Sequence, residues 1–386
     1  MSGLSGVSRM APKQRSARQP RPKPVLEVAG LRAAIDAPPV DLSLQPGTTL
    51  TFFGNQPAAR SRLLDVLAGF LPQLGGIITV SGNDVTSRAP AERRMRIVSP
   101  RDPLFPHLDL RGNIAFGLRA SRQNRTEARA AAGRMISLLG LDGIAGLRPA
   151  ELSPEQSLRA RLARALVTSP DVLLLDDPLH TLDPHAARRI PILLGTLSRA
   201  LNLSVIQSVS RREDALRGGG EIAVFHDNRL LQCADAARLY DRPDCVEVAI
   251  LFGEANTLPG QVLDIDDDVA RVHLACGGIV DAVAAENLTE GQECLVCVRP
   301  DRISPFFGAQ GLGMDEEGEA PVRGILTDST HLGNHIRMRV RCAEGTEIEL
   351  RRPPLQAQKI PVPGTAVQLA WPAAHATAFP PGTGMY

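Results

Sequence analysis

The stretch Asp171-Val-Leu-Leu-Leu-Asp-Asp-Pro-Leu179 is the clearest fold signal in the chain. Its residues 172–175 form a short, continuous apolar run, which is typical of a parallel strand buried on both faces. The run ends in two neighbouring carboxylates, Asp176 and Asp177. Such a pair at the carboxyl end of a parallel strand can serve a catalytic site, and it can also be a helix cap beside a solvated neighbour. The residues alone leave both interpretations open.

Short β-rich runs alternate with helical stretches on both sides of this strand, from residue 25 to about residue 252. Residues 49–54 look like a strand that enters a tight turn. Residues 61–70 then carry apolar side chains at helical spacing. Residues 203–209 and 221–225 are two further strand candidates. This alternation predicts an α/β domain with a mostly parallel sheet over residues 25–252.

The sequence pattern changes at about residue 253, where short strands and turns replace the helical patterns. The segment 253–386 is therefore predicted to be a small all-β barrel domain. Its candidate strands are residues 260–265, 269–275, 294–298, 324–328, 336–341 and 346–350.

Composition limits the functions that this chain of 386 residues can have. The net charge is +1, from 43 basic and 42 acidic side chains, which argues against a dedicated nucleic-acid binder. No stretch reaches the roughly 18–20 apolar residues of a membrane span, and the N-terminus lacks the apolar core of a signal peptide. Residues 1–24 are rich in Ser, Arg, Lys and Pro and lack acids, which predicts a disordered basic tail. We expect a cytoplasmic protein that reaches a membrane only through a partner.

The segment that follows the predicted strand 49–54 occupies the place of a phosphate-binding loop, between a strand and a helix. Such a loop reads G-x-x-x-x-G-K-[ST], so that backbone N–H groups surround the phosphates and the lysine reaches the outer ones. The corresponding residues are Gly54, Asn55, Gln56, Pro57, Ala58, Ala59, Arg60 and Ser61, followed by Arg62. The second glycine is thus Ala59 and the lysine is Arg60, while Pro57 removes an N–H donor. Alone, this stretch would pass for an ordinary strand-turn-helix connection.

Four strings nevertheless resemble, in order and spacing, the signature, Walker B and D-loop motifs of ABC ATPases. They are Leu152-Ser-Pro-Glu-Gln156, Arg161-Leu-Ala-Arg-Ala-Leu-Val167, the opening stretch 171–179, and Leu182-Asp-Pro184. The strings Leu104-Phe-Pro-His-Leu108, Asn113-Ile-Ala-Phe-Gly-Leu118 and Tyr240-Asp-Arg-Pro243 are similar to importer ATPases. The chain therefore resembles the ATP-binding subunit of an ABC importer over residues 25 to about 375.

The C-terminal part is similar to the TOBE barrel that importer ATPases carry, most clearly in Val298-Arg-Pro-Asp-Arg-Ile303. Two strings, Gly253-Glu-Ala-Asn-Thr-Leu-Pro-Gly260 and Leu332-Gly-Asn-His335, look most like the polyamine branch, although iron, sulfate and sugar importers are close. The resemblance implies a P-loop NTPase-type ABC ATPase domain, with a helical signature subdomain at about residues 100–165, followed by an OB-like TOBE barrel.

The resemblance also implies a site for ATP and magnesium. Ser61 and Asp176 would hold the metal, and Asp177 would stand at the position of the general base. The nucleotide contacts would be residues 54–62, Pro100 at the Q-loop position, Asp183, and the signature residues Ser153, Pro154, Glu155 and Gln156. The implied partners are permease subunits and a second ATPase subunit, in a homodimer or a heterodimer, on the cytoplasmic face of the membrane.

Several of these positions depart from the family pattern. Pro100 replaces the Q-loop glutamine, Ser210 stands at the switch-histidine position, and residues 31–36 lack the aromatic that stacks on adenine. The signature glycines are Pro154 and Glu155, whose setting also reads as a helix start with Ser153 as the N-cap and a capping box to Gln156. At the base position Asp177 replaces glutamate.

These departures predict very weak or absent hydrolysis, with weak nucleotide binding retained through Asp176, Ser61 and Arg60. Three functions remain open at this point. The chain could be an importer subunit that turns ATP over slowly, a pseudo-ATPase beside an intact partner, or a regulatory scaffold outside transport.

Overall fold

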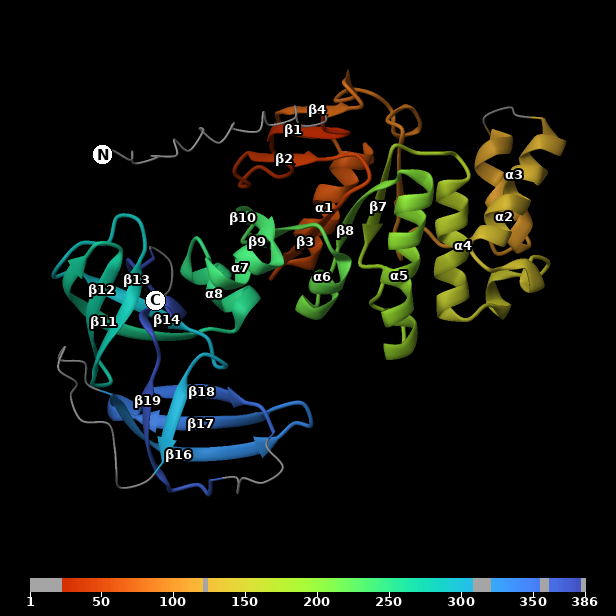
Figure 1. Cartoon of the computed structure of the whole chain (residues 1–386). Helices are drawn as coiled ribbons and strands as arrows, with labels where there is room; N and C mark the ends of the chain where they lie inside the picture. Colours follow the sequence, from red (N-terminus) through yellow and green to blue (C-terminus); the bar gives the residue numbers. More distant parts are fainter. Residues whose placement is uncertain (1–22, 121–123, 308–320, 355–360, 383–386) are drawn as a thin grey trace, which may run out of the picture.

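A computed structural model describes residues 23–120, 124–307, 321–354 and 361–382 of the chain. Figure 1 shows an α/β part, coloured red to green, and a β-rich part, coloured cyan to blue. The predicted basic tail, 1–24, lies outside the described residues except for its last two positions.

The centre of the α/β part is a six-stranded sheet with the order β10-β9-β3-β8-β7-β6. Its strands are β3 (Thr49–Gly54), β6 (Met95–Val98), β7 (Val172–Asp176), β8 (Ser204–Ser208), β9 (Glu221–His226) and β10 (Arg229–Asp235). All neighbours pair in parallel except β10, which runs antiparallel at one edge. Every residue of β7 is buried. The structure thus confirms the predicted mostly parallel sheet.

A second, antiparallel sheet with the order β2-β1-β4-β5 lies beside helix α1 (Pro57–Ala68). Its strands are β1 (Leu26–Leu31), β2 (Val40–Leu44), β4 (Ile77–Val80) and β5 (Asn83–Asp84). One apolar core joins this sheet, α1 and the central sheet, through Leu26, Leu64 and Phe52 among others. This packing holds α1 against the carboxyl end of β3, where the candidate site lies.

A helical subdomain lies at the end of the α/β part that is farthest from the β-rich part (Figure 1), and its last helix packs against β6. It contains α2 (Leu110–Ala120), α3 (Arg125–Leu138) and α4 (Pro154–Leu166), with short 3-10 turns η2 (Asp142–Ile144) and η3 (Pro149–Glu151). A further 3-10 turn, η1 (Pro90–Glu92), precedes β6. Helix α5 (Pro184–Leu201) follows β7, and a leucine- and alanine-rich core joins it to α4 and to the sheet. The predicted helical signature subdomain is therefore present.

The β-rich part is built from two sheets. Helices α6 (Arg212–Gly218), α7 (Ala236–Asp241) and α8 (Val246–Gly253) lead to it. A closed barrel has the order β11 (Asn256–Asp266), β12 (Val269–Leu274), β13 (Ile279–Ala284), β20 (Ala376–Phe379) and β14 (Glu293–Val298). A five-stranded sheet has the order β15 (Ser304–Phe307), β19 (Ala366–Ala370), β16 (Val322–His331), β17 (Ile336–Cys342) and β18 (Glu347–Arg352). Two 3-10 turns complete the part, η4 (Ala343–Gly345) and η5 (Ala373–His375).

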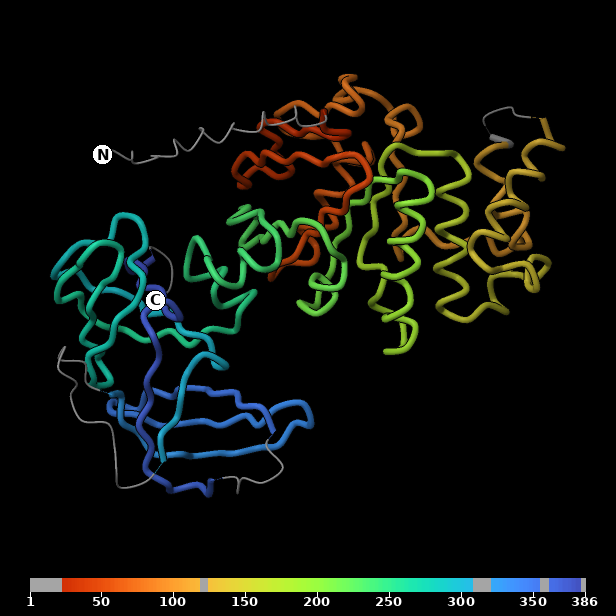
Figure 2. Tube along the Cα trace, in the orientation of Figure 1, coloured from red at the N-terminus to blue at the C-terminus, as the bar shows by residue number. Residues whose placement is uncertain are grey.

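The all-β prediction for this region is confirmed, and the second sheet is an addition to it. Figure 2 shows the blue end of the trace returning to the barrel, where β20 pairs with β14. Within the described residues, no helix combines the length and the apolar character that a bilayer crossing requires.

Candidate functional site

The candidate site lies at the carboxyl ends of β3, β7 and β8, where α1 begins. In open α/β sheets this edge is where ligands bind, because polar loop residues gather there outside the apolar core. The structure brings Arg60 and Ser61 of α1 together with Asp176 at the end of β7, Asp177 directly after it, and Ser210 after β8.

The carboxylate of Asp176 is buried, with 4% of the residue exposed, and both of its oxygens are hydrogen-bonded. The hydroxyl of Ser61 donates to Oδ1 over 2.6 Å. The hydroxyl of Ser99 and Nη2 of Arg101 each donate to Oδ2 over 3.0 Å. The two predicted metal ligands, Ser61 and Asp176, are therefore in contact. The guanidinium of Arg101 is a further partner of the same carboxylate.

Arg101 is fixed by two carboxylates at once. Its Nη1 and Nη2 donate to the two oxygens of Asp65 on α1, over 2.7 and 3.1 Å, in addition to the bond to Asp176. These hydrogen bonds that Arg101 donates, first to Asp65 and then to Asp176, raise the pKa of Arg101 despite its partial burial. The predicted contact Pro100 is exposed, while its neighbours on either side, Ser99 and Arg101, make the contacts.

The guanidinium of Arg60 lies inside the loop that precedes α1. Only 2% of Arg60 is exposed. Its Nη1 donates to the carbonyl of Gly54 over 2.5 Å, and its Nε and Nη2 donate to the hydroxyls of Ser208 and Ser210, each over 3.3 Å. Burial lowers the pKa of Arg60, and the charges of Asp177 and Asp176 oppose that change. All three of these partners of Arg60 thus belong to its own chain.

Helix α1 begins at Pro57, with Gln56 as its N-cap residue, so that Ala58, Ala59 and Arg60 are already helical. Pro57 therefore stands in the first turn, where a missing N–H leaves no helical bond unmade. The loop is reduced to Gly54, Asn55 and Gln56. A Cβ on Gly54 would lie 2.0 Å from the carbonyl oxygen of Phe225, so backbone packing alone demands a glycine there.

The remaining loop side chains are tied to the protein itself. The amides of Asn55 and Gln56 donate to Oδ1 of Asp227, over 3.2 and 2.9 Å. Nε of Arg62 donates to the carbonyl of Ala33 over 2.6 Å. These contacts close the loop over the start of α1.

Asp177 and Ser210 contact each other directly. The hydroxyl of Ser210 donates to Oδ2 of Asp177 over 2.7 Å, and the backbone N–H of Asp177 donates to the carbonyl of Ser208 over 3.0 Å. Asp177 has a left-handed backbone, with a φ of 43°. The residues predicted at the base and switch positions are therefore neighbours, and the cation next to them is Arg60.

The signature segment makes a helix start. Ser153 caps α4 through its hydroxyl, 3.2 Å from the N–H of Gln156, and Oε1 of Gln156 accepts from the N–H of Ser153 over 2.9 Å. Pro154 is the first helical residue, as the capping box predicted. Glu155 pairs with Arg159 over 2.7 Å and with Arg189 of α5.

Asp183 caps α5, and it accepts from the N–H groups of His185 and Ala186 over 2.8 and 3.0 Å. The hydrogen bonds of the Ala186 and His185 N–H groups lower the pKa of Asp183, so its charge stays on the helix terminus.

Comparisons with known proteins agree with this architecture. The sequence profile described as "ABC transporter" matches residues 38–180, and the profile "TOBE domain" matches residues 296–379. The Fe(3+) ions import ATP-binding protein FbpC 1 of Rhizobium meliloti (strain 1021) is 32% identical over 309 residues, which cover 80% of this chain and 84% of that protein. The chain belongs to the ATP-binding subunits of ABC importers.

Two further comparisons support this placement. The spermidine/putrescine import ATP-binding protein PotA of Rubrobacter xylanophilus is 30% identical over 338 residues, covering 87% of each chain. The solved structure of cbiO1 from Clostridium perfringens, part of the ABC transporter complex cbiONQ, aligns with a TM-score of 0.51 at 21% identity. It covers 55% of this chain and 89% of cbiO1, and it shows the shared fold.

ATP-binding subunits of this family bind ATP with magnesium. The side chains as they lie in this structure do not fit either ATP or magnesium. Magnesium takes oxygen ligands in a near-octahedral set. Both oxygens of Asp176 are instead bonded, one of them to the cationic Arg101. The guanidinium of Arg60 fills the loop that would surround phosphates.

The resemblance places the adenine near residues 31–36, and the space beside that segment is also small. A cavity of about 40 Å³ lies between the alanine-rich segment 33–40 and the loop, with Asn55, Ala59 and Arg60 among its lining residues. Sites for small molecules usually have volumes of about 300–1,000 Å³.

The sequence prediction missed the residues that complete this group, namely Asp65, Ser99, Arg101 and Ser208. One signal was available, because a basic residue directly follows the position where the Q-loop glutamine is lost. Asp65 gave no signal, since it lies on the helix that also carries Ser61, one turn further along.

Proposed function

We propose that this importer subunit is a pseudo-ATPase, in which the chain's own arginines take the places of the metal and of the phosphate-binding lysine. The observation that carries the proposal is the ion pair between Arg101 and Asp176, with 3.0 Å between Nη2 and Oδ2. A carboxylate that is already neutralised by a cation has little electrostatic gain left to offer a second cation. Seating magnesium would first require the removal of Arg101.

Arg60 supports the proposal independently. A lysine at this position would extend one point charge toward a phosphate, whereas the planar guanidinium is already bonded to Gly54, Ser208 and Ser210. Moving it toward a nucleotide would leave the Gly54 carbonyl and two hydroxyls without these bonds. The cost of breaking bonds to a charged group is about 1.5–3 kcal/mol each.

In the proposed complex, the chain sits at the cytoplasmic face of the membrane beside permease subunits and an intact ATPase subunit. It would contribute docking surface and its β-rich part, while the partner supplies hydrolysis. The relatives are named for import of Fe(3+) and of spermidine/putrescine, and both cargoes are cations. We retain a polyamine as the proposed solute, within that cationic class.

Calorimetric titration with ATP, with and without magnesium, tests the proposal on the full chain. We expect no saturable heat with millimolar nucleotide and no phosphate release above that of the Asp176→Asn variant. An intact importer ATPase, measured in parallel, is the positive control. Stoichiometric magnesium-dependent binding together with Asp176-dependent phosphate release would exclude the pseudo-ATPase. Capture of permease and ATPase subunits by the tagged chain then distinguishes a transport role from a scaffold outside transport.

A further inference from the structure

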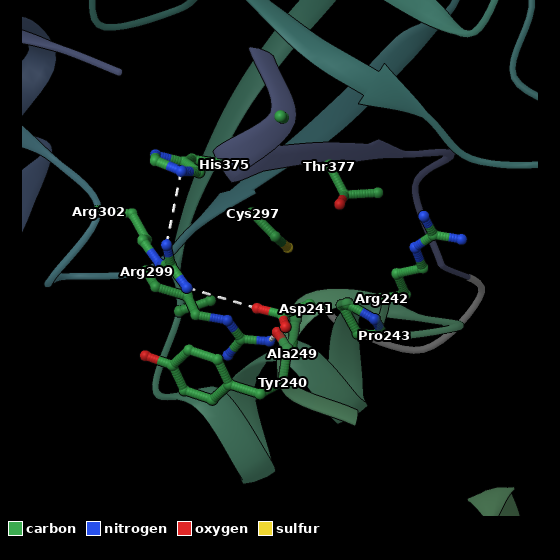
Figure 3. Close-up of a pocket in the computed structure, with 12 residues that line it drawn as sticks. Tyr240, Asp241, Arg242, Pro243, Ala249, Cys297, Arg299, Arg302, His375 and Thr377 are labelled. Carbon is green, nitrogen blue, oxygen red and sulfur yellow. Dashed lines mark hydrogen bonds and ion pairs between the residues drawn. The ribbon is translucent and has the colours of Figure 1, made fainter. Parts of the chain in front are cut away.

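A hollow of about 250 Å³ lies between the α/β part and the barrel, away from the candidate nucleotide site. One wall follows the end of α7 and part of α8, with Tyr240, Asp241 and Arg242. The other wall comes from the β-rich part, with Arg299, Arg302 and Thr377 among its residues. Figure 3 shows Arg302 and Arg242 on opposite sides of this hollow.

The hollow carries an excess of positive charge. Three guanidinium groups, those of Arg242, Arg299 and Arg302, face one lining carboxylate, Asp241. Nη2 of Arg302 lies 3.4 Å from Asp241, and its Nε lies 3.8 Å from Asp301, which are long ion pairs. Within the described part of the chain, Arg242 and Arg299 form no ion pair.

Arg299 is a buried part of this positive charge, because only 6% of the residue is exposed. Burying a charge raises the free energy of the folded state. Its guanidinium stacks on the ring of Tyr240, 3.9 Å from the centroid, and donates to the carbonyls of Leu239 and Tyr240. Its Nη1 has no hydrogen-bond partner among the described residues, but it lies against Gly253, outside the lining of the hollow, so only the charge of Arg299 acts there. Burial lowers the pKa of Arg299, and the charges of Asp301 and Asp241 oppose this change without forming an ion pair with it. A buried cation that no carboxylate contacts is unfavourable unless another anion approaches it. Three guanidinium groups against the two carboxylates of Asp241 and Asp301 leave one positive charge for an anion to balance.

The other lining groups suit an oxyanion. His375 also lines the hollow, and its Nε2 lies 3.5 Å from Nη1 of Arg302 (Figure 3). The hydroxyl of Thr377 offers another donor. Burial raises the pKa of Cys297 and of Tyr240 to about 12, so neither adds negative charge.

We propose that this hollow binds a small phosphate-bearing anion, held by Arg242 and Arg302 at its two sides and by the charge of Arg299 beneath. Arginine recognises phosphate through paired N–H donors. The volume exceeds that of a bare phosphate ion, and Pro243, Ala249, Ala255 and Ala374 supply apolar walls for a short carbon skeleton. A phosphate monoester of a small metabolite meets both conditions.

Such a ligand would contact both parts of the chain at once. Arg242 follows α7 in the α/β part, whereas Arg302 and Thr377 belong to the β-rich part. Binding would therefore stabilise the junction between them. This inference is independent of whether the nucleotide site is active.

The test is calorimetric and thermal titration of the full chain with inorganic phosphate and with glycerol 3-phosphate, at constant ionic strength. We expect saturable binding, tighter for the monoester, and a rise in Tm. Arg242→Gln and Arg302→Gln should each weaken binding about tenfold or more, as the loss of a charged hydrogen bond does. Because Arg242 is exposed, its substitution leaves folding intact.

Arg229→Gln is the matched control, since Arg229 is also exposed but lies on β10, outside the lining. Citrate separates phosphate recognition from general anion binding. Absence of saturable binding, equal binding by all three variants, or a preference for citrate over both phosphates would each overturn the proposal.

Discussion

Nη2 of Arg101 lies 3.0 Å from Oδ2 of Asp176, although the two residues are 75 positions apart in the sequence. Arg101 is 56% exposed at its side chain, while the side chain of Asp176 is 5% exposed. The pair thus places a partly solvated cation on a buried anion, at the position that the resemblance to importer ATPases assigns to magnesium. Arg101 is the residue whose removal should expose the carboxylate to other cations.

Replacing Arg101 by Gln should lower the free energy of unfolding by about 1–2 kcal/mol, because a buried carboxylate loses its cation while the lost partner was partly screened by solvent. Arg94→Gln is the control, since it breaks an exposed arginine pair with Asp171 and should cost less than about 1 kcal/mol. Urea unfolding measures both. Magnesium should stabilise Arg101→Gln more than the wild type, and an equal response would contradict the assigned role of Arg101.

Replacing Arg60 by Lys should not create an ATPase. The lysine would restore one charge, but α1 would still begin at Pro57 and Ser210 would still stand beside Asp177. Steady-state phosphate release should stay at the level of the Asp176→Asn background. Turnover in the single Arg60→Lys variant would show that the position of the helix start does not limit hydrolysis.

The parts of the fold that could be predicted are those that one local pattern specifies. The apolar run of β7 and the capping box at Ser153 are both present as expected, because neighbouring residues alone determine them. The group around Asp176 could not be predicted, since Asp65 and Arg101 reach it only after α1 and β6 pack on the sheet. The separate five-stranded sheet of the β-rich part was also missed, because the sequence prediction assigned its strands to the barrel.

Pro57 shows how one residue supports two interpretations. From the sequence it removes a donor from a phosphate-binding loop, whereas in the structure it starts helix α1. Proline is favoured at that position because its fixed φ suits a helix and its missing N–H is not needed. The loop is therefore shorter than the motif spacing indicates.

Ser153→Ala should lower the free energy of unfolding by about 1 kcal/mol, the usual cost of losing an N-cap. Ser153→Asp should retain most of the stability, because its carboxylate can also accept from the N–H of Gln156. Ser157→Ala is the control, since this serine lies inside α4 and alanine favours a helix interior. Thermal unfolding compares the three variants. Equal stability of Ser153→Ala and wild type would show that the cap contributes nothing.

Glu254 should give the junction an acid-sensitive contact. Its Oε2 pairs with Arg212 of α6 over 3.0 Å and with Arg351 of β18. Burial alone would raise the pKa of Glu254, but the hydrogen bond from Arg351 and the charges of both arginines lower it below the ordinary 4.5. A folded pKa below the unfolded one stabilises the fold above the unfolded value, and this contribution disappears as pH falls through the folded pKa.

Glu254→Gln should therefore destabilise the chain at pH 7 by about 0.5–1 kcal/mol, a modest value because Glu254 is 45% exposed at its side chain. The difference from wild type should shrink as the pH falls below the ordinary pKa of glutamate and through the lowered pKa of Glu254. Glu290→Gln, at an exposed site without an ion pair among the described residues, should show no such pH dependence. Urea unfolding between pH 3 and pH 7 measures this, and a difference of the same size at every pH would exclude the ion pair as its cause.

Gly253→Ala should loosen the junction by displacing Arg299. A Cβ on Gly253 would lie 1.1 Å from Nη1 and 2.3 Å from Cζ of Arg299. The guanidinium cannot retreat without leaving the Tyr240 ring and the carbonyls beneath it, so we expect a loss of about 1–3 kcal/mol, as for other overpacked sites.

Gly195→Ala is the matched control, because no heavy atom of the described chain lies within 4 Å of that Cβ position on α5. Alanine should stabilise the helix there by about 0.5–1 kcal/mol. The two substitutions add the same methyl group and should shift the thermal midpoint in opposite directions. A Gly253→Ala protein as stable as wild type would show that Arg299 is free to move, and that its stacking on Tyr240 does not hold the junction together.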